Sequence, residues 1–544
     1  MAPCPEWNTA DSSQRTTAAF HRVLIRGREA LIQAAGGVLR SVAMDPKTAA
    51  NAPIPPSPSI TSRLWWFAAW LVCPVVMFAV SYPLVQHHER LVDIGVLSEY
   101  RVLALVVYGG GIGAMFVLYL LALRTAMAAT SESPLLPVIA GGVLYSVLMA
   151  ALYPVNAIDL FIYAVRSRIF TTHGENPQAW TPADFPNDPL MAFSSAEWSV
   201  TGSPYGPLWN LIAAPVTALA GDNLLAALIG FKLLTVLAVL AGAWLIALTR
   251  RAAGLPVAAG VLLYLWNPLV LWEGIGNGHN DTVMMVPIVA AMLAWTTGRD
   301  RLVIPLLVVA VLIKYVAVLS LPLAVVVLWR RQPSNWQRAR WLVSSALLSL
   351  LVAGIALAPF YDPRATWSSL TAQGGIFLTS PAAIALSFLR DSLGGAGATT
   401  LVTTVGSSLM AVFLLVQLAL LWHRPDRFPR ALFETMFVFL LIAAWNFRVW
   451  YLIWLVALAA LLPIGWPAWR TIAWTAGGLT GYVLFIWVWH WWDADFPTIQ
   501  AIGVLVLTGP ATVVTIIELV QLRRSRRQAT ELPVAAPRLT EGGR

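Results

Sequence analysis

Three groups of polar residues interrupt a chain that is otherwise strongly apolar. In the first, Asp159, Tyr163 and Arg166 are spaced at i, i+4 and i+7, so their side chains share one face of a helix. A carboxylate directly after an apolar segment is costly to desolvate, and a positioned carboxylate can take a proton from a hydroxyl group. From spacing alone, a structural Asp–Arg pair or a helix cap explains the group equally well.

The second group is dense in glycine, amide, histidine and acidic side chains. It reads Glu-Gly-Ile-Gly-Asn-Gly-His-Asn-Asp and contributes the candidate residues Glu273, Asn277, His279, Asn280 and Asp281. Its glycines permit backbone angles that bring the peptide close to a ligand. His279 and Asp281 are two candidate metal ligands, which without a regular third are weak evidence for a metal site. A tight polar turn is the plain interpretation, and a ligand-binding loop is the one we favour.

Two more polar positions lie between these groups. Asn176 precedes Pro177, and Tyr205 stands in the sequence Ser-Pro-Tyr-Gly-Pro-Leu. Proline and glycine around Tyr205 fix a turn before the apolar segment that follows. Both residues are candidates for shaping a site.

The third group is three cations beside apolar segments, Lys314, Arg364 and Arg448. Snorkelling to lipid headgroups is the ordinary explanation for each of them. Three cations on one predicted outer face run against the positive-inside rule and would suit a bound phosphate, which arginine contacts bidentately. Four tryptophans are candidates for stacking on sugar rings: Trp209, Trp367, Trp445 and Trp450.

Composition predicts the class of protein that holds these groups. Of 544 residues, 58% are hydrophobic and 11% charged, whereas soluble domains carry about 25% charged residues. The net charge of +9 comes from Arg and Lys at the ends of apolar segments, which is the pattern of a membrane protein and argues against a nucleic-acid partner. Cys4 and Cys73 are the only cysteines, so neither a disulfide framework nor a cysteine metal site is expected.

We therefore predict an all-α, polytopic integral membrane protein of about fourteen transmembrane helices, each near the ~20 residues that cross a bilayer. The predicted spans are 64–84, 101–124, 135–154, 223–249, 255–272, 281–297, 301–314, 316–329, 340–360, 399–422, 430–445, 447–464, 470–490 and 498–522.

The spans define four regions. Residues 1–44 form a basic cytoplasmic tail, either an amphipathic helix on anionic lipid or disordered, and 45–63 a Pro/Ala-rich linker. The membrane domain covers 64–522, and 523–544 is a second basic tail. Both termini lie inside, and 155–222 is the first large external loop. Within it, 205–220 is read as a surface helix, since counting it as a span would place Arg250 and Arg251 outside.

The motifs resemble a known family. The external acid, the SPYGPL sequence and the Lys between short apolar segments resemble GT-C glycosyltransferases. The stretches NPLVLWEGIGNGHND and D-x-x-x-Y-x-x-x-x-R are similar to actinobacterial polyprenol-phosphomannose-dependent α-(1→6)-mannosyltransferases of lipomannan synthesis. The resemblance covers 64–522, and GNGHND is its most specific part.

The resemblance implies a fold, a reaction and site residues. A GT-C fold in the bacterial plasma membrane would move mannose from polyprenyl-phosphate-mannose to an oligomannoside or glycolipid acceptor on the extracytoplasmic face, with inversion. Asp159 would be the catalytic base, and Lys314, Arg448 and Arg364 would bind the donor phosphate. No cofactor is required, although a divalent metal stays an option. Sugar and acceptor contacts would come from Tyr163, Arg166, Asn176, Tyr205, Glu273, Asn277, His279, Asn280 and Asp281.

Other classes give different expectations. A transporter or flippase for polyprenyl-linked sugars would carry its ionisable residues near the bilayer midplane, whereas here they lie at predicted outer helix ends. A protein O-mannosyltransferase or an aminoarabinose-type transferase would differ in its acceptor. A noncatalytic assembly factor would show no turnover.

Overall fold

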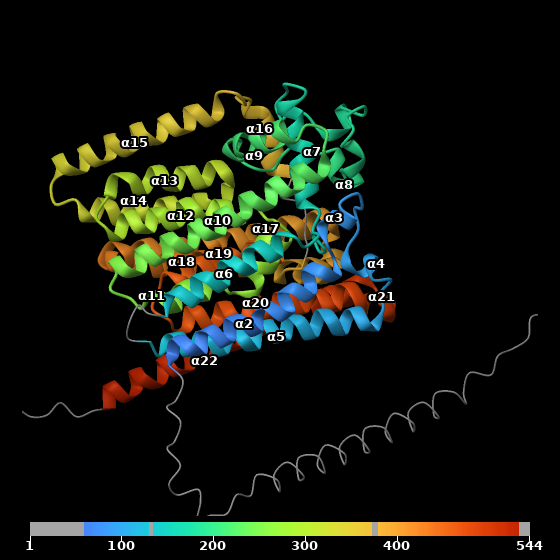
Figure 1. Ribbon diagram of the computed structural model, residues 1–544. Helices are drawn as coiled ribbons and strands as arrows, with labels where there is room; N and C mark the ends of the chain where they lie inside the picture. The colour runs from blue at the N-terminus through green and yellow to red at the C-terminus, as the bar shows by residue number, and fades with distance from the viewer. Residues whose placement is uncertain (1–58, 130–133, 373–378, 532–544) are drawn as a thin grey trace, which may run out of the picture. The chain divides into compact units, whose positions relative to one another are not determined.

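A computed structural model describes residues 59–129, 134–372 and 379–531 (Figure 1). The predicted tail 1–44 lies outside these residues, as do 45–58 of the linker and 532–544 of the second tail. The described residues contain helices and one isolated antiparallel bridge between Pro83 and Leu152, which confirms the all-α prediction for this part of the chain. Residues 60–63, predicted as the end of the linker, form the first turn of helix α2 instead, where Ser59 caps the helix.

The predicted spans from 64 to 329 all fall on helices. The longer ones are α2 (Ile60–Ser81), α5 (Val102–Met127), α6 (Leu135–Ala150), α10 (Leu224–Ala252), α11 (Val257–Leu265), α12 (Asp281–Thr296), α13 (Asp300–Ile313) and α14 (Ser320–Arg331). Shorter elements connect them: α3 (Leu84–His87), α4 (Ile94–Leu97), α7 (Asp159–Thr171), η2 (Pro182–Asp184), η3 (Met191–Phe193), α8 (Ala196–Ser199), α9 (Pro207–Ala220), η4 (Val270–Gly276) and η5 (Tyr315–Leu319).

The C-terminal part continues in the same way. Its longer helices are α15 (Asn335–Leu357), α17 (Pro381–His423), α18 (Phe428–Ile442), α19 (Leu452–Ala460), α20 (Trp466–Tyr482) and α22 (Phe496–Glu531). Its short elements are α16 (Pro363–Ala372), η7 (Pro425–Arg427), η8 (Val449–Tyr451), η9 (Val483–Val488) and α21 (Trp489–Trp492).

Seven helical stretches of the described chain are long and apolar enough to cross a bilayer. They are Ile60–Ser81, Val102–Met127, Leu224–Ala252, Asn335–Leu357, Pro381–His423, Trp466–Trp492 and Phe496–Ser525. The chain is therefore a multi-pass membrane protein. The count of about fourteen crossings stays a prediction, because several of the other apolar helices, such as α6 and α12, have only 16 residues.

One predicted span is broken. The sequence predicts a continuous helix over 255–272, but α11 and η4 are bent by 56°. Proline cannot donate to a preceding carbonyl, and the side chain of Asn267 instead accepts from the backbone N–H of Leu269 at 3.0 Å. The prediction of one straight helix is wrong at Asn267–Pro268. The bend turns η4, and the polar loop after it, into the protein interior.

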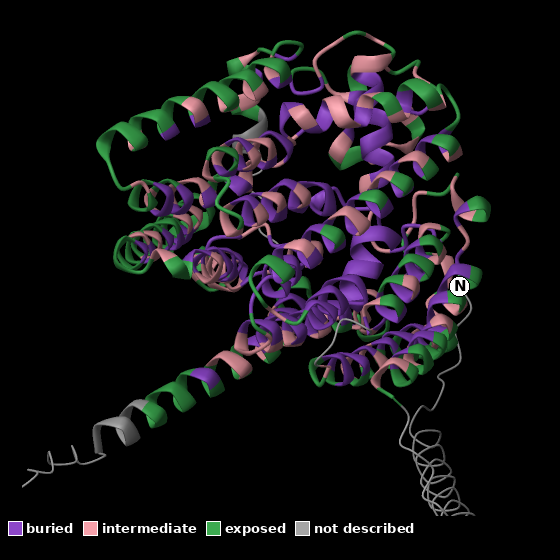
Figure 2. Cartoon of the chain, turned by 60° about the vertical axis from the view of Figure 1, so that its left-hand side comes forward, coloured by how far each residue is buried: buried purple, intermediate pink, exposed green. Residues whose placement is uncertain are grey.

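Burial separates central from peripheral helices. All nine residues of α11 and all nine of α19 are buried. In contrast, α15 and α17 expose long apolar side chains, including Leu350 at 69% and Leu415 at 64%. Figure 2 shows exposed residues along the peripheral helices and buried ones in the middle of the bundle. Apolar surface on this scale is unfavourable in water and ordinary against lipid tails. The outer helices thus contact lipid, and the polar residues of the loops converge on the centre.

The predicted external loop is itself helical. It holds α7, α8 and α9, which lie with α16 at one end of the bundle (Figure 1). Helix α7 packs against α9 and α10, and ten of its residues are buried. This packing fixes the helix that begins at Asp159.

Candidate active site

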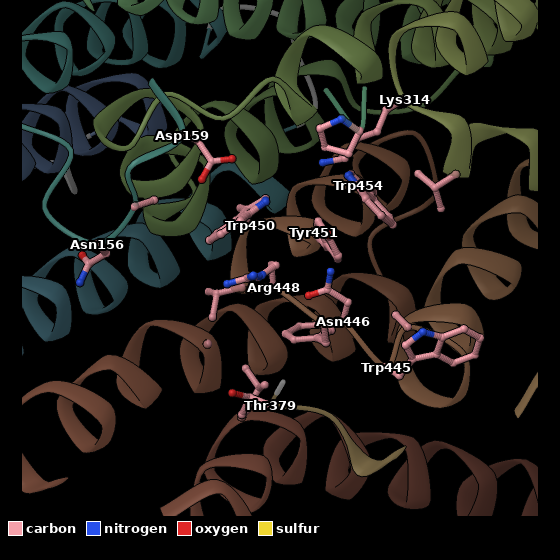
Figure 3. Close-up of a pocket in the computed structure, with 18 of the residues that line it drawn as sticks. Asn156, Asp159, Lys314, Thr379, Trp445, Asn446, Arg448, Trp450, Tyr451 and Trp454 are labelled. Carbon is pink, nitrogen blue, oxygen red and sulfur yellow. The ribbon is translucent and has the colours of Figure 1, made fainter. Parts of the chain in front are cut away.

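A cavity of about 1060 Å³ opens beside the start of α7 (Figure 3). Asp159, Lys314 and Arg448, from three distant parts of the sequence, all line it. Figure 3 shows Arg448 with Trp450 and Tyr451 on the segment after α18, beneath Asp159 and Lys314. The fold thus brings the predicted acid and two of the three predicted cations into one space.

Asp159 is the centre of the polar contacts in this cavity. Its Oδ1 accepts from the Tyr205 hydroxyl at 3.1 Å and more weakly from the Tyr163 hydroxyl at 3.4 Å. Its Oδ2 lies 3.7 Å from Nε2 of His279, close enough for an ion pair and too long for a good hydrogen bond. The pairing of Asp159 with Arg166, left open by the sequence, is not what the structure contains.

His279 lies between two carboxylates. Its Nδ1 donates to the backbone carbonyl of Glu273 at 2.8 Å and is 3.4 Å from Oε2 of the same residue. The ring is fully buried and stacks on Trp450 with centroids 3.9 Å apart and planes 16° from parallel. These contacts fix the ring orientation and leave Nε2 facing Asp159.

The charges around Asp159 set its ionisation. Burial alone would raise its pKa, but the contact with His279 and the positive charges of Arg448 and Lys314 outweigh burial and lower the pKa to about 2. Burial would likewise lower the pKa of His279, whereas Asp159 and Glu273 raise it. Each group therefore favours the charged form of the other.

The loop after η4 adopts its shape through glycine and amide contacts. Gly278 has φ of +75°, which side-chain-bearing residues rarely adopt, and a Cβ there would meet the Leu160 side chain at 2.6 Å. Asn277 donates to Glu273 at 2.9 Å and accepts from the backbone N–H of Asn156 at 3.3 Å. The loop is thereby tied to the residues before α7.

Lys232 fixes the same loop from behind, and sequence reasoning missed it. The residue is 1% exposed, and its ammonium group donates to the carbonyls of Leu152 at 2.8 Å, Ile275 at 3.0 Å and Gly276. A lysine in the middle of a long apolar span was the available signal, since such a charge needs buried partners.

Lys314 forms an ion pair with a carboxylate within the protein. Its Nζ contacts both oxygens of Asp281, at 2.8 and 2.9 Å, and the indole N–H of Trp454 donates to the same carboxylate at 2.6 Å. The Gly206 N–H donates to the backbone carbonyl of Ile313 at 3.0 Å, and this contact brings Tyr205 beside Lys314. Lys314 therefore already has a full counter-charge.

Arg448 is placed differently. Its guanidinium lies over the Trp450 ring, 5.6 Å from the centroid, and it lines the cavity. No carboxylate pairs with it among residues 59–129, 134–372 and 379–531. Its charge is therefore available to an anionic ligand, more so than that of Lys314.

The other predicted residues have different positions. Arg166 lines the cavity, and Tyr163 donates to Asp159. Asn280 is fully buried, with its backbone N–H directed at the Tyr163 hydroxyl. Arg364 is exposed at the start of α16, and Asn176 donates to the Phe360 carbonyl; neither lines the cavity.

The four candidate tryptophans lie in different environments. Trp445 and Trp450 line the cavity. Trp209 is 3% exposed and packs against Tyr163 and Phe231, so its ring is part of the core. Trp367 is 69% exposed on α16, away from the cavity lining.

A metal ion has few ligands here. Across the described part of the chain, no three His, Cys, Asp or Glu side chains gather in a group that could hold one. Both oxygens of Asp281 are already used by Lys314. Metal dependence stays an untested expectation.

The sequence that carries most of this site is similar to known proteins. Residues 64–331 match the family described as "Alpha-(1->6)-mannopyranosyltransferase, N-terminal domain". This segment contains all the site residues named above that precede α15. The protein is thus a membrane glycosyltransferase of the mannosyltransferase class. The match to the MptA_B family model is confined to this segment.

Individual relatives agree with that assignment. "Alpha-(1->6)-mannopyranosyltransferase A" of Mycobacterium tuberculosis is 26% identical over 436 residues, which are 74% of this chain and 80% of the relative. The protein of the same name from Corynebacterium glutamicum is 26% identical over 184 residues, 34% of this chain and 37% of the relative. No solved structure matches the chain significantly.

The contacts of Lys314 predict a coupled effect on stability. Lys314→Met should lower the free energy of unfolding by roughly 3–5 kcal/mol, because it leaves Asp281 buried without its counter-charge. Adding Asp281→Asn should recover part of the loss. Thermal melting of the purified variants in detergent measures both. A Lys314→Met protein as stable as the parent would show that the pair carries no such cost.

Proposed function

We propose that the protein transfers mannose from polyprenyl-phosphate-mannose to a glycan or glycolipid acceptor at the extracytoplasmic face, forming an α-(1→6) linkage with inversion. The observation that carries the proposal is that Asp159 and Arg448 line one cavity. The Asp159 carboxylate is positioned by His279, whereas Arg448 has no carboxylate partner in the described chain. A hydroxyl acceptor needs a carboxylate to take its proton, and a phosphate leaving group needs a cation to stabilise its charge.

The apolar wall of the cavity supports a lipid-linked donor. Helices α17, α18, α20 and α22 contribute to it, through residues that include Met410, Leu414, Phe439 and Leu507. Helix α17 also exposes apolar side chains to lipid. A ligand with a sugar phosphate at Arg448 could therefore lay its hydrocarbon chain along these helices, where burial of each methylene contributes about 0.8 kcal/mol.

The chemistry is a single displacement. The acceptor oxygen attacks the anomeric carbon as the bond from that carbon to the phosphate oxygen breaks. Asp159 takes the hydroxyl proton, and polyprenyl phosphate leaves with the bonding electrons, stabilised by Arg448. Displacement at a β-linked donor yields an α-linked product. Tyr205 and Tyr163 orient the Asp159 carboxylate.

Donor binding would tune the base. With a pKa of about 2, Asp159 by itself is a weak base. A phosphate that engages Arg448 removes part of the positive charge that lowers this pKa. Asp159 would then become more basic when the donor is present, which favours proton removal in the ternary complex.

The proposal also includes the setting. The fold would be of the GT-C type with about fourteen crossings in a bacterial plasma membrane, with both termini cytoplasmic and the α7–α9 region outside. The clustering of α7, α8, α9 and α16 at one end of the bundle supports a common external layer over the site.

Loss of the carboxylate is the direct test. Asp159→Asn should reduce mannose transfer from purified lipid-linked mannose by roughly 100-fold or more, because no base accepts the acceptor proton. Asp184→Asn, an exposed acid of the same loop outside the cavity, is the matched control and should keep its activity. Wild-type turnover in Asp159→Asn would refute the assignment.

Removal of His279 should change the pH profile. His279→Gln takes away the interaction that most strongly holds the pKa of Asp159 down, so that pKa should rise. Activity that needs the carboxylate ionised is lost as pH falls through that pKa, and the acid limb of kcat/KM should therefore move to higher pH. An unchanged acid limb in pH–rate measurements would argue against the contact.

Substitution of Arg448 tests the phosphate site. Arg448→Gln should lower kcat/KM for the donor roughly 10- to 100-fold, since a hydrogen bond to a charged group contributes about 1.5–3 kcal/mol. Arg364→Gln is the comparison variant, and steady-state kinetics should show little change in kcat/KM for the donor, because Arg364 does not line the cavity. An equal loss at Arg364, or none at Arg448, would reverse their assignment.

A further inference from the structure

One face of α7 lines the cavity for more than a single turn. Asp159, Ile162 and Arg166, at i, i+3 and i+7, all contribute to its lining, whereas Leu160 and Phe161 between them are fully buried in the core. Seven residues of helix extend about 10 Å. The cavity therefore continues well past the carboxylate, over a distance greater than one sugar ring.

Trp198 stands at the far end of this face. It belongs to α8, lines the cavity and is partly exposed. Arg166 lies over its ring with Cζ 5.9 Å from the centroid. No local sequence pattern marks this tryptophan, because nothing in the loop around it indicates that it returns to α7.

Contacts through Arg166 hold Trp198 in place. Nη2 of Arg166 donates to the side chain of Thr201 at 2.7 Å, to its carbonyl at 3.2 Å, and weakly to the Trp198 carbonyl at 3.4 Å. The indole and the guanidinium are thus fixed together before any ligand binds. A rigid aromatic surface of this kind costs little conformational entropy on binding.

Arg166 also has hydrogen-bond donors to spare. The side chain is 4% exposed, and its Nε is a buried donor without an acceptor within the described residues. Only Nη2 makes hydrogen bonds in that part of the chain. Nη1 makes no hydrogen bond there, so its N–H groups can donate to a ligand hydroxyl in the cavity that Arg166 lines.

We propose that Trp198 and Arg166 form a second sugar subsite, which binds the acceptor residue next to the one that receives mannose at Asp159. This inference rests on the proposed transferase function. Its ligand class is an oligosaccharide of at least two neutral hexoses: the apolar face of a ring lies on the indole, and its hydroxyls meet the guanidinium. The chain of the acceptor would run along α7.

Acceptor length provides the test. With the full-length protein and lipid-linked mannose, transfer would be measured to a methyl mannoside and to an α-(1→6)-linked mannotriose. Trp198→Ala should lower kcat/KM for the trisaccharide about tenfold and leave the monosaccharide value unchanged, while Trp198→Phe keeps most of the activity. Trp180→Ala is the matched control, since Trp180 is 43% exposed outside the cavity.

Equilibrium dialysis of radiolabelled mannotriose gives a readout that does not depend on turnover. Weaker trisaccharide binding in Trp198→Ala, but not in Trp180→Ala, supports the subsite. If the parent protein binds the trisaccharide through Trp198 yet transfers no mannose, the proposed function fails and the subsite stands. Equal losses for both acceptors, or unchanged trisaccharide binding and kinetics in Trp198→Ala, would overturn the subsite.

Discussion

The site depends on one electrostatic constraint: a half-buried carboxylate at the wall of a largely apolar cavity must remain charged. Asp159 meets it through His279, which is itself held by the carbonyl and carboxylate of Glu273. An unpaired buried charge would neutralise instead. The bend between α11 and η4, the positive φ of Gly278 and the hydrogen bonds of Lys232 all serve to carry His279 to this position. The same loop also contacts the start of α7 through Asn277 and Asn156, and through Gly278 and Leu160.

The two cations beside Asp159 are not equivalent. Lys314 is neutralised by Asp281 and holds α12 against the turn between α13 and η5, so its first role is in assembly. Arg448 has an aromatic partner and no carboxylate partner in the described chain, which leaves its charge for a ligand. Positive charges that look alike in sequence therefore differ in what they can bind, because one was matched within the protein and the other was not.

Sequence reasoning could find residue types but not their partners. Apolar segments located the helices, and the i, i+4, i+7 spacing placed Asp159, Tyr163 and Arg166 on one helix, because both depend on local periodicity. The pairing of Lys314 with Asp281, 33 residues apart, depends on tertiary packing that no local pattern contains. The same holds for Trp198 beside Arg166, and for Arg364, whose sequence context resembles that of the site cations although α16 holds it outside the cavity lining.

The apolar wall made by α17, α18, α20 and α22 has a consequence for turnover. If a prenyl chain occupies it, the spent carrier departs sideways into the leaflet, a two-dimensional medium in which it stays concentrated around the enzyme. Product and fresh donor then compete for the same groove according to their ratio in the bilayer and independently of the aqueous volume. Removal of the used carrier by other membrane enzymes would then decide how often the groove is free for fresh donor.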